Sequence, residues 1–181
     1  MELSPEQADS ALTTGWRGMA HLRDDKVVSI SLAPDLVTKP PPLWFVEFHE
    51  PGFTPPPVVS ALAVHLIAFT GHDQLTGAVL DDAALRVADI AYHDQLAAIR
   101  WYPATGEVHQ IYVQPAWRRR GVGNALIYAT AVLSAARRWA RLWGSGVRTE
   151  IGEEFRNAST WGYRAAALTE VAPPMTPDAS G

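Results

Sequence analysis

Hydrophobic and polar positions along the chain predict short strands first and a long helix later. The segments 26–32 (KVVSISL) and 43–48 (LWFVEF) are rich in β-branched or aromatic residues and are separated by the stiff KPPP stretch, so both are predicted strands. The segment 58–69 satisfies the spacing of a helix face and also that of a buried strand. Residues 5–20 and 75–85 are predicted to form short helices.

The pattern is clearer from residue 86 onward. Three strands are predicted at 86–93, 96–103 and 108–115, joined by short turns into an antiparallel meander. Apolar residues then recur every three or four positions over residues 122–140, which predicts an amphipathic helix with one face on a sheet. A strand at 141–146, a helix at 149–161 and a strand at 163–171 follow. This order predicts an α/β (α+β) fold in which helices flank a twisted sheet.

Length and composition indicate a single domain over residues 1–172, with residues 173–181 as a disordered tail. The chain has no cysteine, which excludes disulfides, thiolate metal sites and cysteine nucleophiles. Its histidines lack the spacing of metal ligands, so no metal is predicted. Without a long apolar run or a signal-like start, we expect a cytoplasmic protein with no membrane partner.

Charge narrows the class of ligand. The formal net charge of -4 disfavours a general nucleic-acid partner, which usually meets a basic surplus. Six of the fifteen basic residues nevertheless fall in two short stretches, at 118–120 and 137–141. A local basic region in an acidic protein favours a compact anionic ligand.

The stretch VQPAWRRRGVGNAL (113–126) joins the predicted strand to the predicted long helix. Pro115 cannot donate to a strand ladder, and the first turn of a helix leaves several N–H groups without a backbone partner. Gly121 and Gly123 would let a ligand approach those N–H groups without a Cβ in the way. Together with the helix dipole, these features predict a cradle for phosphate or pyrophosphate.

Two common phosphate motifs do not fit this loop. A P-loop needs a lysine that is absent here, and the dinucleotide fingerprint needs a third glycine where Leu126 stands. The pattern Arg118-x-x-Gly121-x-Gly123, after a strand ending in Val-x-Pro and before a long helix, closely resembles motif A of the GNAT superfamily of acetyltransferases. The resemblance is strongest over residues 107–140 and extends plausibly over 86–171, whereas residues 1–60 are divergent.

This resemblance implies a mostly antiparallel sheet with a central splayed strand pair, and acetyl-CoA as co-substrate. It implies that backbone N–H near Val113 polarises the thioester carbonyl. The residues predicted to bind the cofactor are those of the strand end and loop: Ile111, Tyr112, Val113, Arg118, Arg119, Arg120, Gly121, Val122, Gly123 and Asn124.

Catalytic candidates lie on the strand before the loop. Glu107 and His109 alternate with Ile111 and Val113, so all four are predicted to share one face. Two histidines stand at the matching positions in arylalkylamine-type members of the family, and the resemblance implies that Glu107 and His109 accept the proton of the attacking amine. The alternative is that Glu107 and His109 form a simple polar pair at a sheet edge and have no catalytic role.

The family's general acid, a tyrosine four residues before a Gly-Phe pair, has no clear counterpart. Gly162 and Tyr163 match that pair, which puts Ala158 at the position of the tyrosine. Tyr163 is then expected to pack in the core, and no general acid is assigned.

The predicted function is therefore acetyl-CoA-dependent transfer of an acetyl group directly to a primary amine of a small molecule or protein. The alternatives are a non-catalytic acyl-CoA-binding or regulatory module, and a nucleic-acid-binding or nucleic-acid-modifying protein. The acceptor and the acyl chain length stay open. Dimers are common in the family, which leaves a homodimer open as well.

Overall fold

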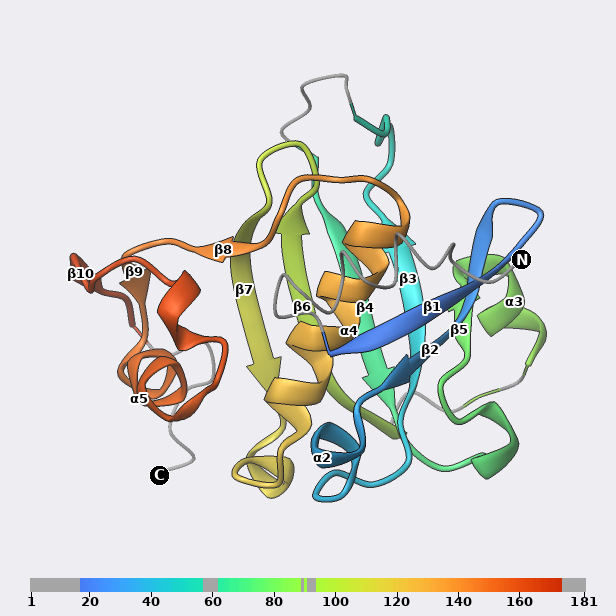
Figure 1. Ribbon diagram of the computed structural model, residues 1–181, viewed down its shortest axis with the longest axis horizontal. Coiled ribbons are helices and arrows are strands. Elements are labelled where there is room, and N and C mark those ends of the chain that lie inside the picture. Colours follow the sequence, from blue (N-terminus) through green and yellow to red (C-terminus); the bar gives the residue numbers. More distant parts are fainter. Residues whose placement is uncertain (1–16, 57–61, 89, 91–93, 174–181) are drawn as a thin grey trace.

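A six-stranded sheet forms the centre of the computed structural model, which describes residues 17–56, 62–88, 90 and 94–173 (Figure 1). The sheet has the strand order β5-β3-β4-β6-β7-β8. The four inner strands pair antiparallel, while β5 and β8 pair parallel at the two edges. The bounds are β3 (Trp44–His49), β4 (Val64–Phe69), β5 (Val79–Asp81), β6 (Gln95–Tyr102), β7 (Glu107–Val113) and β8 (Trp143–Gly144). This mixed, mostly antiparallel sheet confirms the predicted fold class.

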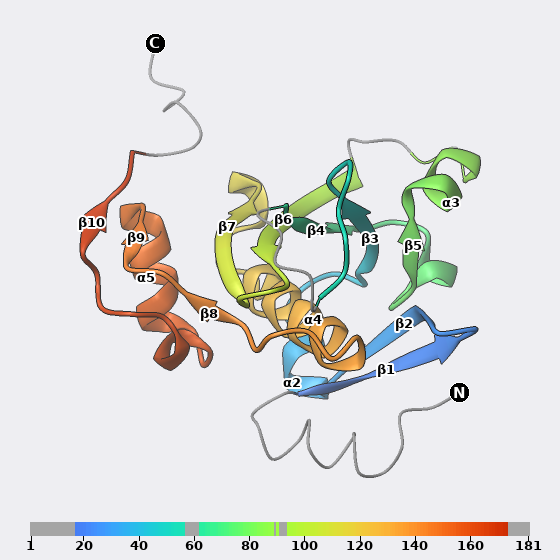
Figure 2. The same cartoon turned by 90° about the horizontal axis from the view of Figure 1, so that it is seen from above.

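Helix α4 (Val122–Ala136) lies between this sheet and an N-terminal hairpin formed by β1 (Gly18–Arg23) and β2 (Lys26–Leu32). Figure 2 shows the helix enclosed on both sides. Every residue from Ala125 to Ser134 is buried, so the prediction of an amphipathic helix with one buried face is wrong. The outer face is buried because the hairpin covers it. The 15-residue helix carries no charged side chain, a signal compatible with burial on all sides.

The first predicted helix, over residues 5–20, is wrong in the part that the structure describes. Residues 18–20 of the predicted span 5–20 belong to strand β1, and residues 5–16 lie outside the described part of the chain. The hairpin joins the rest of the fold through Ile30, whose N–H donates to the Gly77 carbonyl at 2.7 Å. A short helix, α2 (Pro34–Val37), then leads toward β3.

The sheet face opposite α4 is covered over β3, β4 and β5 by the short 3-10 helix η1 (Asp73–Leu75) and by α3 (Asp82–Val87). A second core lies there, in which Trp44 stacks on Phe69 with ring centroids 4.4 Å apart. Over β6 and β7 the described residues leave the same face partly exposed. We call this region the open face; it includes Ala98, Arg100, Tyr102, His109 and Gln110.

The middle of the chain differs from the predicted meander. The ambiguous segment 58–69 contains strand β4 over 64–69, while residues 58–61 lie outside the described part. In the predicted helix 75–85, only residues 82–85 are α-helical. The predicted strand 86–93 is wrong at its start, because residues 86–87 complete α3, and residues 89 and 91–93 lie outside the described part. Asp81 starts this helix by accepting a hydrogen bond from the Ala84 N–H at 2.8 Å. The meander is therefore β4-β6-β7.

The C-terminal unit leaves the sheet after β8. It contains β9 (Val147–Arg148), α5 (Glu150–Ala158), the short helix η4 (Gly162–Arg164) and β10 (Glu170–Val171). Strand β8 pairs with β7 over two residues and then diverges, and β9 pairs with β10 instead. Figure 1 shows this unit beside β7. The splayed strand pair of the resemblance is thus β7 and β8, at one end of the sheet. The predicted strand 163–171 is reduced to residues 170–171.

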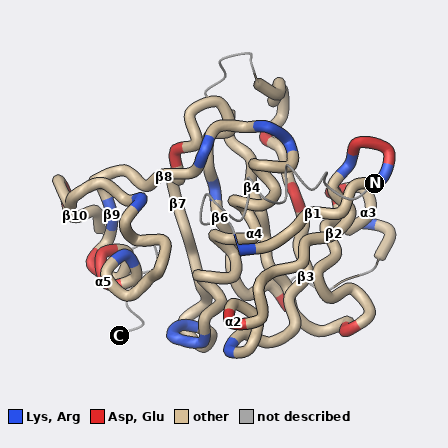
Figure 3. Tube along the Cα trace, in the orientation of Figure 1, with Lys and Arg blue, Asp and Glu red and all other residues tan. Residues whose placement is uncertain are grey.

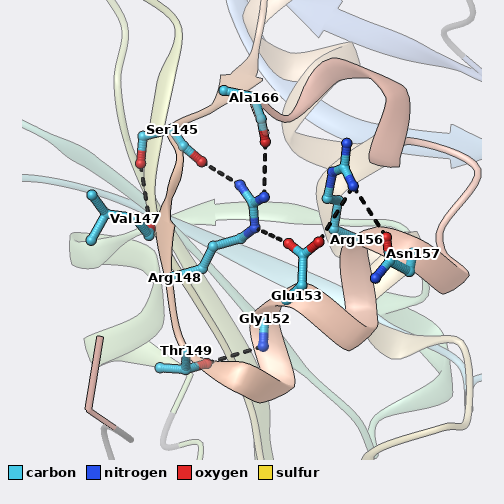
Figure 4. A network of polar contacts seen from close by, with 9 residues as sticks. All are labelled: Ser145, Val147, Arg148, Thr149, Gly152, Glu153, Arg156, Asn157 and Ala166. Atoms are coloured by element: carbon cyan, nitrogen blue, oxygen red, sulfur yellow. Dashed lines mark hydrogen bonds and ion pairs between the residues drawn. The ribbon is translucent and has the colours of Figure 1, made fainter. Parts of the chain in front are cut away.

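One guanidinium holds this unit together (Figure 4). Arg148 donates to the Glu153 carboxylate at 2.7 Å, to the Ser145 carbonyl at 2.5 Å and to the Ala166 carbonyl at 2.8 Å. The hydrogen bond from Arg148 is the main reason that the pKa of Glu153 is lowered. Thr149 caps α5 by accepting from the Gly152 N–H. The loop, the helix and the returning chain therefore meet at Arg148.

Candidate functional site

Strand β7 has a free edge beyond Val108, which we call the open edge (residues 109–113). No strand of the described chain pairs with it on the side of β8. The Gln114 N–H donates to the Leu96 carbonyl of β6 at 2.8 Å, so the N–H groups of Ile111 and Val113 point the other way by alternation. The open edge therefore presents the backbone donors that the resemblance assigns to the thioester carbonyl.

The arginine-glycine loop connects this edge to the start of α4. After the short 3-10 helix η3 (Pro115–Trp117), the chain turns at Gly121, whose φ is 78°. A Cβ on Gly121 would lie 3.1 Å from Lys39 Cβ and 3.3 Å from Pro40 Cδ, so both conformation and space require glycine. Within the described chain no side chain caps α4. Its first N–H groups, from Val122 to Asn124, are therefore available to an anion.

The three loop arginines point in different directions, although Figure 3 shows basic residues gathered in this loop. Arg118 donates through Nε to the Val113 carbonyl at 3.1 Å and so fixes the turn. Arg119 forms a 2.7 Å ion pair with Glu154 of α5, and both side chains are exposed. The Arg120 guanidinium lies over the Trp117 ring, 5.1 Å from its centroid. The side chains of Arg119 and Arg120 are exposed and can therefore contact a ligand.

The C-terminal unit packs on the first two turns of α4. A Cβ on Gly123 would lie 3.0 Å from Phe155 Cε2, so this glycine makes room for a side chain of α5 and not only for a ligand. The Ser159 hydroxyl donates to Asn124 Oδ1 at 2.5 Å, and the hydroxyls of Tyr128 and Thr160 are 2.9 Å apart. Asn124 therefore contributes its side chain to packing, and its backbone N–H to the helix start.

A β-bulge separates the four residues that were predicted to share one face. In the β6–β7 ladder Arg100 is opposite Gln110 but Trp101 is opposite Val108, which makes His109 an extra residue. Ile111 and Val113 consequently pack toward the main core with α4. Glu107 is opposite Tyr102, and the His109 ring contacts the Tyr102 ring, so both lie on the open face. The prediction of a common face holds for Glu107 with His109 only.

Further polar residues lie on β6 and near its partner strand β4, on the side of β6 away from the predicted catalytic pair. Arg100 donates through Nε and a terminal nitrogen to Glu50 Oε1, at 3.0 and 2.8 Å. The pKa of Glu50 is lowered to about 2, mainly because its carboxylate accepts the Ala63 N–H, with Arg100 and His65 adding to this against the effect of burial. Sequence reasoning missed Arg100 and Glu50, because only the strand register brings Arg100 opposite Gln110 of β7 and within reach of Glu50.

Arg137, in the second basic stretch, is committed to the core. It forms a 2.5 Å ion pair with Glu47, and its guanidinium also lies 5.3 Å from the Trp139 ring centroid. Burial raises the pKa of Glu47, but the hydrogen bond to His49 and the charge of Arg137 outweigh it, and the pKa is lowered. A basic surface that includes Arg137 is thus not available, which weakens the nucleic-acid alternative.

The expected equivalent of the family's Gly-Phe pair is also different. Tyr163 is 69% exposed, so the expectation that it packs in the core is wrong. Trp161, two residues earlier, is buried instead. Ala158 is the last residue of α5 and is exposed. The 3-10 helix at 162–164 turns Tyr163 away from the core, a feature that the aromatic pattern alone does not reveal.

Across the described residues, no three metal-binding side chains form a group that could hold an ion. The helices of the same residues are all too short or too polar to cross a membrane.

The described chain thus combines two diverging strands, β7 and β8, with a loop that leads from β7 into the uncapped start of α4. Residues 72–158 match the model of the acetyltransferase (GNAT) family. These residues therefore form a region of the GNAT acetyltransferase family, whose members carry out acyl-CoA-dependent acetyl transfer. Comparisons with curated proteins and with solved structures give no match.

Proposed function

We propose that this protein is an N-acetyltransferase that moves an acetyl group directly from acetyl-CoA to a primary amine of a small molecule or protein. The observation that carries the proposal is the continuity between the open edge of β7 and the uncapped start of α4. A single loop connects the backbone N–H groups of Ile111 and Val113 to those of Val122 to Asn124.

The residues fit acetyl-CoA as a co-substrate. The N–H groups at the start of α4, with Arg119 and Arg120, would hold the pyrophosphate. The pantetheine arm would add along the open edge of β7, where backbone N–H groups lack a strand partner. The N–H of Val113 or Ile111 would then stabilise the oxyanion of the tetrahedral intermediate, a contribution of about 3 kcal/mol for one donor.

Glu107 and His109 supply the proton chemistry in this proposal. An amine attacks only when neutral, so a base on the open face must take its proton directly or through water. His109 is exposed and Glu107 is partly buried, and both lie near the strand edge where the thioester would sit. The amine nitrogen forms a bond to the acetyl carbon, and the thiolate of CoA leaves with the electron pair of the broken C–S bond.

Calorimetric titration with acetyl-CoA, and separately with a short DNA duplex, tests the binding part. We expect binding of acetyl-CoA alone, and no binding of acetyl-CoA would refute the assignment of the loop. The double variant Glu107→Gln/His109→Ala tests the chemistry in a thiol-release assay with a screen of amines. We expect kcat to fall by roughly 100-fold or more with little change in acetyl-CoA affinity, because neither side chain belongs to the proposed pyrophosphate contacts. Full activity would remove both residues from the mechanism.

A non-catalytic acyl-CoA-binding module is the second candidate. It is favoured by Ala158, which has no hydroxyl and which the sequence resemblance puts at the position of the family's tyrosine. Such a module would bind acetyl-CoA in the same titration and release no thiol with any amine.

A further inference from the structure

The open face carries an ordered row of side chains beside the predicted base. Tyr102 at the end of β6 contacts both His109 of β7 and Arg100 of its own strand. The sequence motif includes neither Tyr102 nor Arg100, and the chemistry proposed above does not use them.

His109 needs such contacts because it is the extra residue of the bulge. A bulged residue has no partner of its own across the ladder, so backbone pairing does not fix its direction. The described ring contact of His109 is with Tyr102, at a centroid distance of 5.7 Å and an interplanar angle of 63°. This edge-to-face arrangement is a favoured geometry for aromatic pairs.

Tyr102 also has a contact that restricts its own ring, made by Arg100. The Arg100 guanidinium lies 5.5 Å from the Tyr102 ring centroid, within the range of a cation–π contact. Arg100 has little freedom, because two of its nitrogens bond to the same Glu50 oxygen. Glu50 is itself anchored by the Ala63 N–H at 3.0 Å and by His65 at 3.4 Å. The row therefore runs from a fixed carboxylate to the His109 imidazole.

We propose that Tyr102 is a positioning residue, which orients the imidazole of His109 on the open face and is itself held by the Glu50–Arg100 ion pair. The contribution comes from the aromatic ring and not from the hydroxyl. The orientation of His109 stands on the geometry alone, whereas its effect on turnover rests on the proposed function.

The test compares Tyr102→Leu, which removes the ring, with Tyr102→Phe, which removes only the hydroxyl. In the protein without acetyl-CoA, the ring C–H signals of His109 are followed by NMR and assigned with His109→Ala. We expect Tyr102→Leu to shift these signals through loss of the ring current and to lower kcat about 3- to 10-fold, with an unchanged KM for acetyl-CoA. Tyr102→Phe should restore both the signals and kcat.

Tyr163→Leu is the matched control, because Tyr163 is an exposed tyrosine whose ring also lies near an arginine, Arg164, at 5.3 Å. It should leave the His109 signals and kcat unchanged. A second variant, Arg100→Gln, removes the cation–π contact with Tyr102 and leaves the Tyr102 and His109 rings unchanged. It should shift the His109 signals in the same direction as Tyr102→Leu, by a smaller amount.

The outcomes separate the two proposals. Unchanged His109 signals in Tyr102→Leu would overturn the positioning role, whatever the activity. A wild-type protein that neither binds nor turns over acetyl-CoA would refute the proposed function, while the NMR comparison would still decide the orientation of His109. Shifted signals with an undiminished kcat would show that the orientation does not serve the reaction and would also overturn the role.

Discussion

Replacement of Gly121 by alanine tests the cofactor loop at its most constrained position. Gly121 combines a left-handed backbone, with φ of 78°, and a close approach to the segment that follows α2. Alanine adds one methyl group and no charge, so its effects come from backbone strain and steric contact. Both act at the residue from which the first N–H groups of α4 emerge.

The expected cost has two parts. A non-glycine residue in the left-handed region costs roughly 1–2 kcal/mol. The new Cβ would lie 3.1 Å from Lys39 Cβ and 3.3 Å from Pro40 Cδ. Both distances are shorter than the optimal carbon–carbon separation of about 3.5–4.0 Å, and overpacking of this kind costs about 1–3 kcal/mol. We therefore expect the free energy of unfolding to fall by roughly 2–5 kcal/mol.

Gly71→Ala provides a matched control. Gly71 has a similar φ of 75°, but a Cβ there would meet no atom within 4 Å. It should cost only the strain, roughly 1–2 kcal/mol. Urea unfolding of both variants gives the difference, and calorimetry gives acetyl-CoA affinity, which should fall in Gly121→Ala alone. Equal losses of stability would refute the claim that the approach of Lys39 and Pro40 makes Gly121 necessary.

Two further changes test the charged residues of the core and of the open face. Glu47→Gln should lower the free energy of unfolding by roughly 2–4 kcal/mol in thermal or urea unfolding, because it leaves the partly buried Arg137 without its charge partner. Asp35→Asn is the control, because it breaks the exposed Arg17–Asp35 ion pair and should cost less than about 1 kcal/mol. The lowered pKa of Glu50, about 2 against an ordinary value of 4.5, stabilises the fold above pH 4.5, and this stability is lost as the pH falls from there toward 2. In urea unfolding Glu50→Gln should therefore be less stable than wild type by about 1 kcal/mol at pH 7, after solvent screening. The difference should shrink below pH 4.5 and disappear only as the pH approaches 2. A difference that does not change with pH would contradict the assignment.

Local sequence patterns were sufficient to predict much of the sheet and the loop that joins β7 to α4. Strands β2 and β6 and the turn from β7 into α4 follow from β-branched residues, prolines and glycines close together in the chain. The register of pairing, by contrast, is a tertiary property. The bulge at His109 arises from how β7 fits β6, and strict alternation along β7 could not reveal it.

The burial of α4 on both sides could also not be predicted from the sequence of the helix itself. Whether a helix is covered on one side or two depends on what the distant residues 18–32 do, and these form a hairpin that packs on it. The Glu50–Arg100 pair joins residues 50 positions apart for the same reason. What the sequence did reveal was the position of the loop between β7 and α4, because the end of the strand, the glycines and the helix start are contiguous.

The enclosure of α4 has a consequence for how the cofactor would be recognised. A helix held by the sheet on one side and by a hairpin on the other cannot rotate or slide without disrupting two layers of packing. The direction of its first N–H groups is thus set before any ligand arrives, and binding an anion there requires little reorganisation. Adaptation to different acceptors would then fall to the exposed side chains of the open face, which lie on the side of the sheet away from α4.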